Sequence, residues 1–154
     1  MTEHHYTECG LMNGVIHGIE AERDDDGDWI VTVPAVNELH AVIAQGIVQH
    51  GAGMSGDELR FLRTEMGMTQ AELARLVHRD KQSIGRWERS EVELDSASEA
   101  LIRRLAIERL HLPIDLGIEE LSSRSVPGTR VQPIDVQAIA GANDGDARYE
   151  LHAA

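Results

Sequence analysis

Short apolar runs and polar turns alternate in the first part of the chain and predict a β-hairpin. The apolar positions of residues 15–19 and the β-favouring run 29–33 flank the turn-rich segment 24–28, and Pro34 stops the second run. The apolar spacing then changes to that of a helix, with Asn37 as its expected N-cap. The apolar face of this predicted helix consists of Leu39, Val42, Ile43 and Ile47.

Three closely spaced helical segments follow, each introduced by a residue that caps helices well. Ser55 precedes a segment that Gly67 ends, Thr69 precedes the next as in a capping box, and Asp80 precedes the third. A longer helix runs from about residue 96 or 98 to residue 110 and is stopped by Pro113. Its expected inward positions are Leu101, Ile102, Leu105 and Ala106.

Beyond Pro113 the pattern weakens. Residues 114–121 allow one more short helix, and segments 131–139 and 148–152 can pair as strands across a turn at 141–145. A partly disordered acidic tail fits the same residues equally well. We therefore predict a mainly α-helical protein in three parts: a β-hairpin and helix for dimerisation or partner binding (1–53), a compact helical domain (54–111), and a weakly structured acidic C-terminal extension (112–154).

Charge is distributed unevenly along the chain. The net charge is −13, yet residues 60–89 hold seven basic and four acidic side chains. Because salt screens charges beyond roughly 8 to 10 Å, a locally basic face can bind an anionic partner on an acidic protein. The acidic remainder suggests a second partner that is basic.

Residues 69–89 meet the physical requirements of a helix pair that inserts into the major groove of DNA. These requirements are two short helices, a tight turn, a small residue at the helix contact and a polar outer face. A generic helical hairpin with a solvated outer face shares them, so the pattern alone does not decide. Ala74 is the small residue, and the inner face consists of Leu73, Val77, Ile84 and Trp87.

The motif itself resembles a known family. Residues 68–74, which read MTQAELA, and residues 82–88, which read QSIGRWE, are similar to the Cro/C1-type (XRE) helix-turn-helix family. In that family Thr/Ser-Gln opens the second helix and Ile-x-x-Trp-Glu ends the third. The resemblance covers residues 57–110 and implies a lambda-repressor-like bundle of about five helices that binds double-stranded DNA.

The resemblance also assigns individual DNA contacts. It implies that Gln70 touches a phosphate and steadies Gln82, and that Gln82 reads a base, since a glutamine can form a bidentate pair of hydrogen bonds with adenine. Arg86, one turn later, is expected to reach guanine or phosphate. The whole expected contact set is Thr69, Gln70, Arg79, Lys81, Gln82, Ser83, Arg86 and Arg89.

Other residues of the motif are expected to hold it together. The resemblance implies that Arg63 pairs with Glu88 for stability and not for DNA contact. The chain departs from the family where His78 and Arg79 replace the usual glycine and apolar residue of the turn. It also has Gly85 where Ser or Ala is common, which weakens a helix by about 0.5 to 1 kcal/mol. The expected structural set is Arg63, Ala74, Ile84, Trp87 and Glu88.

The order of the parts is similar to that of antitoxin-like regulators related to the MqsA group. The likeness begins at residues 6–10, which read YTECG, and implies a dimer that represses its own operon and holds a basic toxin. Typical members bind zinc through paired cysteines, whereas Cys9 is the only cysteine here. Since His4, His5 and His17 also lack a zinc-ligand spacing, we expect no metal and no cofactor.

The remaining functional classes lack support. The chain has no Ser-His-Asp order, phosphate loop or HExxH motif, no apolar stretch of the ~18 residues that a membrane span needs, and no secretory signal at its start. We therefore expect a cytoplasmic protein without enzymatic activity. A homodimer on a pseudo-palindromic operator is expected because one recognition helix reads about half a site.

Three hypotheses for the function remain open. The first is a repressor that is also the antitoxin of a toxin-antitoxin operon. The second is a plain phage-type or host-type repressor with no toxin partner. The third is a protein-interaction adaptor whose helix-turn-helix no longer binds DNA because the net negative charge repels it.

Overall fold

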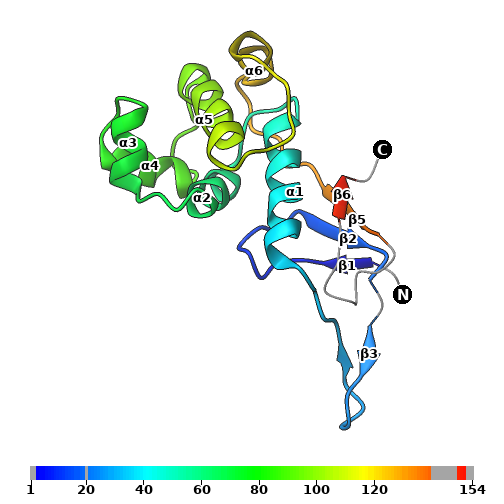
Figure 1. The fold of residues 1–154 in the computed structure, drawn as a ribbon. Helices are drawn as coiled ribbons and strands as arrows, with labels where there is room; N and C mark the ends of the chain where they lie inside the picture. The colour runs from blue at the N-terminus through cyan, green and yellow to red at the C-terminus, as the bar shows by residue number, and fades with distance from the viewer. Residues whose placement is uncertain (1–2, 20, 140–148, 152–154) are drawn as a thin grey trace. The chain divides into compact units, whose positions relative to one another are not determined.

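The computed structural model describes residues 3–19, 21–139 and 149–151, which belong to two compact units (Figure 1). Unit 1 comprises Met1–Ile43 and Pro133–Ala154, and unit 2 comprises Ala44–Gln132. Both ends of the chain therefore belong to the same unit. The division into functional segments at residues 53 and 111 stays a prediction.

Unit 1 contains a four-stranded sheet with strand order β1-β2-β5-β6. Strand β2 (Gly14–His17) is antiparallel to β1 (Glu3–His5) and parallel to β5 (Ile134–Ala138), and β5 is antiparallel to β6 (Tyr149–Leu151). Alternate side chains of β5 are buried, as expected for a strand with one face on a core. The expected strand pairing near the C-terminus is thus confirmed. The expected turn at 141–145 lies outside the described residues.

The expectation of a weakly structured C-terminal extension is wrong for two parts of it. Helix α6 (Ile118–Arg124) follows Pro113, and β5 joins the sheet through β2. The pattern of residues 134–138 allows a strand, but a partly disordered tail fits it equally well. The segment becomes a strand because its buried side chains pack beside a strand that is more than a hundred residues away in sequence.

The hairpin predicted for residues 15–33 is only partly correct. Its turn forms between β3 (Glu22–Arg23) and β4 (Trp29–Ile30), where the Asp24 carboxylate accepts hydrogen bonds from the backbone N–H groups of Asp26 (3.0 Å) and Asp28 (2.8 Å). Residues 14–17, however, do not pair with residues 29–33. They form β2 between β1 and β5, because the buried Val15 and Ile16 find apolar surroundings there.

Helix α1 (Val36–Gln49) agrees with the helix predicted after Pro34. It begins one residue before Asn37, so Asn37 lies inside the helix and is not its N-cap. The boundary between the two units falls within α1. All four expected core positions, Leu39, Val42, Ile43 and Ile47, are buried.

Unit 2 contains the remaining helices, and their predicted caps are present. Ser55 and Thr69 form capping boxes, and Asp80 accepts a hydrogen bond from the backbone N–H of Ser83 at 2.7 Å. Four helices lie between residues 56 and 109, so the five-helix lambda-repressor-like arrangement stays a prediction. The four are α2 (Gly56–Glu65), α3 (Gln70–Leu76), α4 (Lys81–Glu88) and α5 (Ser96–Arg109).

Helices α2 to α5 end with the same left-handed turn, although only one of them uses glycine. The residue after each C-cap has a positive φ, and the backbone N–H of the following residue returns to a carbonyl five residues earlier. The residues with positive φ are Gly67 (69°), His78 (57°), Ser90 (60°) and His111 (51°). The last three adopt a conformation that costs a residue with a Cβ roughly 1 to 2 kcal/mol.

The interior of α5 differs from the prediction at one position. Ile102 and Ala106 are buried as expected, and Leu105 is half-buried, but Leu101 is exposed. Arg103 takes the inward place with its side chain fully buried, because its guanidinium donates to backbone carbonyls of residues 48–52. None of the helices in the described residues has both the length and the apolar character that a bilayer crossing requires.

Candidate nucleic-acid interface

Helices α3 and α4 pack against each other across the tight turn of residues 77–80 (Figure 1). On the inner side, Ala74 of α3 and both Ile84 and Trp87 of α4 are buried. A small side chain at Ala74 allows two short helices to approach closely. The pair therefore has a fixed inner face, from which the outer face of α4 projects.

The outer face of α4 carries three side chains without internal partners. Gln82 and Arg86 lie one turn apart on this face, and Lys81 is beside Gln82 at the first helical position. All three are exposed, and their side chains form no hydrogen bond or ion pair within the part of the chain that the structure describes. A ligand can therefore contact them without breaking bonds inside the protein.

Other side chains of the expected contact set already have partners. The Thr69 hydroxyl accepts the backbone N–H of Glu72 at 3.1 Å, and the Arg89 guanidinium pairs with Glu91 at 3.0 Å. The Gln70 amide donates to Glu88 Oε1 at 3.2 Å, so Gln70 takes part in the inner network, and its expected role of steadying Gln82 stays a prediction.

Ser83 belongs to the start of α4 as well as to the expected contact set. Its hydroxyl and its backbone N–H hydrogen-bond to the Asp80 carboxylate, and these bonds lower the pKa of Asp80. Asp80 is therefore held in the ionised form. The positive end of the helix dipole also stabilises this negative charge. The beginning of α4 is fixed before any ligand binds.

The inner network is centred on the carboxylate of Glu88, which is buried at the end of α4. The Arg63 guanidinium donates to both of its oxygens, at 2.6 and 3.0 Å, and the Arg60 guanidinium lies 3.5 Å away. Burial opposes ionisation of Glu88, but the hydrogen bonds from Arg63 and Gln70 and the positive charges of Arg63 and Arg60 outweigh it and lower its pKa. The expected Arg63–Glu88 ion pair is thus present, and Gln70 donates a hydrogen bond to the same carboxylate.

The start of α2 lies directly against the end of α4. A Cβ placed on Gly56 would lie 2.5 Å from the backbone carbonyl oxygens of both Trp87 and Glu88. Only glycine fits this contact without movement of the backbone. By contrast, the only close neighbour of a Cβ on Gly85 would be the flexible end of the Arg89 side chain, at 3.0 Å. No comparable steric contact therefore requires glycine inside α4.

Arg79, an unusual turn residue for this motif, is held from two sides. Its guanidinium pairs with Asp95 at 2.8 Å and lies over the Trp87 ring, 5.8 Å from the centroid. Arg79 and Arg86 line a hollow of about 230 Å³ together with the acidic Glu93 and Asp95. The hollow is therefore mixed in charge, and Arg79 is preorganised beside α4 although it is partly exposed.

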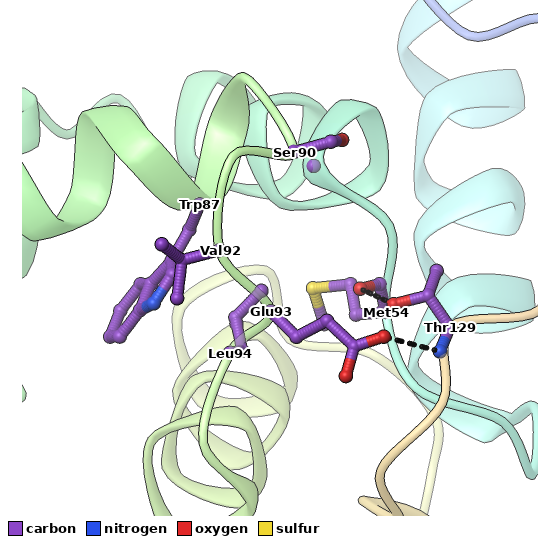
Figure 2. Close-up of a pocket in the computed structure, with 8 residues that line it drawn as sticks. Met54, Trp87, Ser90, Val92, Glu93, Leu94 and Thr129 are labelled. Atoms are coloured by element: carbon purple, nitrogen blue, oxygen red, sulfur yellow. Dashed lines mark hydrogen bonds between the residues drawn. The ribbon is translucent and has the colours of Figure 1, made fainter.

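A second cavity, of about 150 Å³, lies where the loop after α4 meets the segment around Thr129 (Figure 2). Figure 2 shows Trp87 and Val92 on one side and Met54, Glu93 and Thr129 on the other. The Glu93 carboxylate accepts the backbone N–H of Thr129 at 3.3 Å, and the Thr129 hydroxyl donates to the Met54 carbonyl at 3.5 Å. These bonds link the segment after α6 to the loop before α2.

Sequence reasoning missed a second buried network in unit 2. The fully buried Arg103 donates to the carbonyls of Val48 (2.8 Å), His50 (2.7 Å) and Ala52 (2.7 Å), and it pairs with Glu99 at 3.1 Å. Burial lowers the pKa of Arg103, and the charge of Glu99 opposes that shift. The only available signal was the spacing of four residues between an acid and a base, which is also common on solvent-exposed helices.

The residues considered as metal ligands have other surroundings. His17 hydrogen-bonds to Asp135 at 2.9 Å, and His4 lies 3.7 Å from the Glu8 carboxylate. In the residues that the structure covers, no cluster of three or more His, Cys, Asp or Glu side chains is arranged to hold a metal ion.

Comparison with known proteins gives one match. Residues 59–105 match a helix-turn-helix family model of the XRE type. The α3–α4 pair is a helix-turn-helix. The matched range contains every residue of the expected contact and structural sets, and a domain of this type indicates a DNA-binding transcription regulator. No curated protein and no solved structure matches the chain significantly.

Proposed function

We propose that this chain is a sequence-specific repressor that binds a pseudo-palindromic operator as a homodimer. The observation that carries the proposal is that Lys81, Gln82 and Arg86, on the outer face of the second helix of the helix-turn-helix, are exposed and have no side-chain hydrogen bond or ion pair with any described residue. In this proposal Gln82 reads a base, Arg86 reaches guanine or phosphate, and Lys81 contributes a phosphate contact. No catalytic role is assigned to any residue.

Dimerisation is part of the proposal because a single recognition helix reads about half of a typical operator. Two copies bound to two half-sites gain affinity from their high effective concentration. Sedimentation of the free protein and of its complex with DNA measures the number of copies directly. One copy per operator at saturation would contradict this part.

The finer proposal is an antitoxin that represses its own operon and holds a basic toxin. It is supported by the net charge of −13, which persists although the DNA-binding segment is locally basic. A short basic reading frame beside the gene, whose product co-purifies with this chain, is the expected result. If the gene stands alone and its product recruits no partner, the plain repressor is the correct alternative.

Gel-shift titration against the DNA upstream of the gene, at several salt concentrations, tests the DNA-binding proposal. With about four to six phosphate contacts per dimer, the logarithm of the association constant should fall with the logarithm of the salt concentration with a slope of about −4 to −5. A shift that competes equally with unrelated DNA would contradict sequence specificity. Absence of any salt-dependent shift would leave the adaptor hypothesis.

Two substitutions separate base reading from phosphate binding. Gln82→Ala should relax the preference at one operator position by about 1 to 3 kcal/mol, whereas Arg79→Ala should weaken binding to all sequences alike. Arg130→Ala, which removes an exposed arginine outside the matched range, is the control and should leave affinity unchanged. Equal losses at every operator position for Gln82→Ala and Arg79→Ala would contradict the assignment of Gln82.

A further inference from the structure

The β3–β4 hairpin of unit 1 exposes two large apolar side chains. Trp29 is 65% exposed and Ile30 is 48% exposed, although both lie in a strand. Only two residue pairs join β3 to β4, and a short two-stranded ribbon of this kind is marginal in water without further packing. Exposed aromatic and aliphatic side chains on such an element are typical of the anchor of a protein interface.

The Trp29 side chain is held in place and is not a loose surface residue. Arg23 is directly opposite Trp29 across the ribbon, and its guanidinium lies over the indole ring at 4.7 Å from the centroid. The Asp24 carboxylate closes the turn through two backbone hydrogen bonds. The indole is thus presented in a defined orientation, which lowers the entropy cost of binding.

The surroundings of Trp29 are strongly acidic. Between residues 22 and 30 there are five carboxylates and one guanidinium. The carboxylates of Asp25, Asp26 and Asp28 form no hydrogen bond or ion pair within the described residues, so their charge is not neutralised internally. An occupant of this surface must therefore carry positive charge around an apolar pocket or strip.

We propose that the β3–β4 hairpin is the docking element for a basic protein partner, which receives Trp29 and Ile30 in an apolar recess and pairs its Lys or Arg side chains with the surrounding aspartates. Charge complementarity selects this occupant. A second copy of the hairpin would bring two acidic turns together, and DNA would meet its own sign of charge. The inference rests on the partner half of the proposed function and is independent of the DNA half.

The test uses the two tryptophans of the chain. In ¹⁵N-labelled protein each tryptophan gives one indole N–H signal, and Trp29→Phe identifies the signal of Trp29. The probes are short synthetic peptides in which Arg and Leu alternate, and matched peptides with Glu in place of Arg. The Arg/Leu peptide should shift the Trp29 signal saturably and more weakly at high salt, and the Glu/Leu peptide should not.

Substitutions then locate the binding energy. Measured by calorimetric titration, which does not need the Trp29 signal, Trp29→Ala, and separately Asp25→Asn with Asp26→Asn and Asp28→Asn, should each weaken Arg/Leu peptide binding at least about tenfold. Asp24 is left intact because its carboxylate holds the turn. Ile118→Ala, at a site 55% exposed in α6, and Glu119→Gln with Glu120→Gln are the matched controls and should change binding less than about twofold.

Several outcomes would overturn the inference. A Trp29 signal that no Arg/Leu peptide moves, or that both peptide types move equally, excludes a basic partner at this surface. A shift that appears on raising the protein concentration alone assigns the surface to a second copy, and a shift on adding a DNA duplex assigns it to nucleic acid. Gel shifts with the same variants keep the two proposals apart, since operator binding should be unaffected by Trp29→Ala.

Discussion

Two arginines of unit 2 show opposite uses of the same side chain. Arg103 of α5 is fully buried, and its guanidinium donates to three backbone carbonyls near the end of α1 and to Glu99. Arg86 of α4 is exposed and forms no ion pair or hydrogen bond through its side chain among the described residues. The guanidinium of Arg103 joins chain segments inside the fold, whereas the guanidinium of Arg86 remains available to a ligand.

The same contrast separates the contact between α2 and α4 from the outer face of α4. Glu88 and Gly56 join α2 to α4 through a part-buried ion pair with Arg63 and a close backbone contact, whereas the side chains of Lys81 and Gln82 form no hydrogen bond or ion pair among the described residues. We therefore expect substitutions at the buried junctions to change stability, and substitutions on the outer face of α4 to change DNA affinity alone.

The sharpest form of this comparison is one substitution made at both arginines. Arg103→Met should lower the free energy of unfolding by about 3 to 5 kcal/mol, because it leaves Glu99 without its cation and three carbonyls without donors. Arg86→Met should change it by less than about 0.5 kcal/mol and weaken operator binding instead. Urea unfolding and gel shifts on both variants measure the two effects, and similar losses of stability would break the comparison.

Substitution of Glu88 should give the next largest loss of unfolding free energy, and this loss should depend on pH. Glu88→Gln should lower the free energy of unfolding by about 1.5 to 3 kcal/mol at neutral pH, since charged hydrogen bonds from Arg63 are lost. The pKa of Glu88 is lowered in the folded state, so its stabilisation is complete above its ordinary pKa of 4.5 and is lost as the pH falls through the folded-state value.

The difference in unfolding free energy between wild type and Glu88→Gln should therefore be constant near neutral pH and shrink in acid. Urea unfolding of both proteins across the acid range measures this difference. Glu58 and Asp95, whose pKa values are also lowered, are present in both proteins and largely cancel. A difference that grows in acid would show that Glu88 is not ionised in the folded protein.

The helix-turn-helix was predictable because its signals are local. Capping at Ser55, Thr69 and Asp80 depends on side chains within three residues of the helix start, and the Arg63–Glu88 pair follows from a family resemblance. The internal bond of Gln70 to Glu88 was missed, because the same amide is equally suited to phosphate and to a carboxylate.

The sheet and the buried arginine were not predictable in the same way. Residues 14–17 pair with residues 3–5 and 134–138, and the distant partner cannot be inferred from a period-two pattern alone. The spacing of apolar residues in α5 assigns Arg103 to the surface. Its burial depends on backbone carbonyls in the last turn of α1 and in the segment that follows. Long-range pairing decided both cases.

Substitutions of Gly56 and Gly85 test whether the contact between α2 and α4 or the interior of α4 limits stability. Gly56→Ala should cost about 1 to 3 kcal/mol of unfolding free energy, because its Cβ meets two carbonyl oxygens that cannot move independently. Gly85→Ala should be tolerated or stabilising by about 0.5 to 1 kcal/mol, since only the flexible end of Arg89 must shift. Thermal or urea unfolding decides, and a larger loss for Gly85→Ala would contradict the contact.

The smallest expected effect concerns His78, in the turn that precedes the outer face. Its φ of 57° is left-handed, so His78→Gly removes strain, but glycine also gains freedom in the unfolded chain. The net result should be a stabilisation of about 0.5 to 1 kcal/mol, and His111→Gly, with φ of 51° at the end of α5, should behave alike. If operator affinity falls only for His78→Gly, the imidazole belongs to the DNA interface; if affinity is unchanged, the turn belongs with the buried junctions that hold α4.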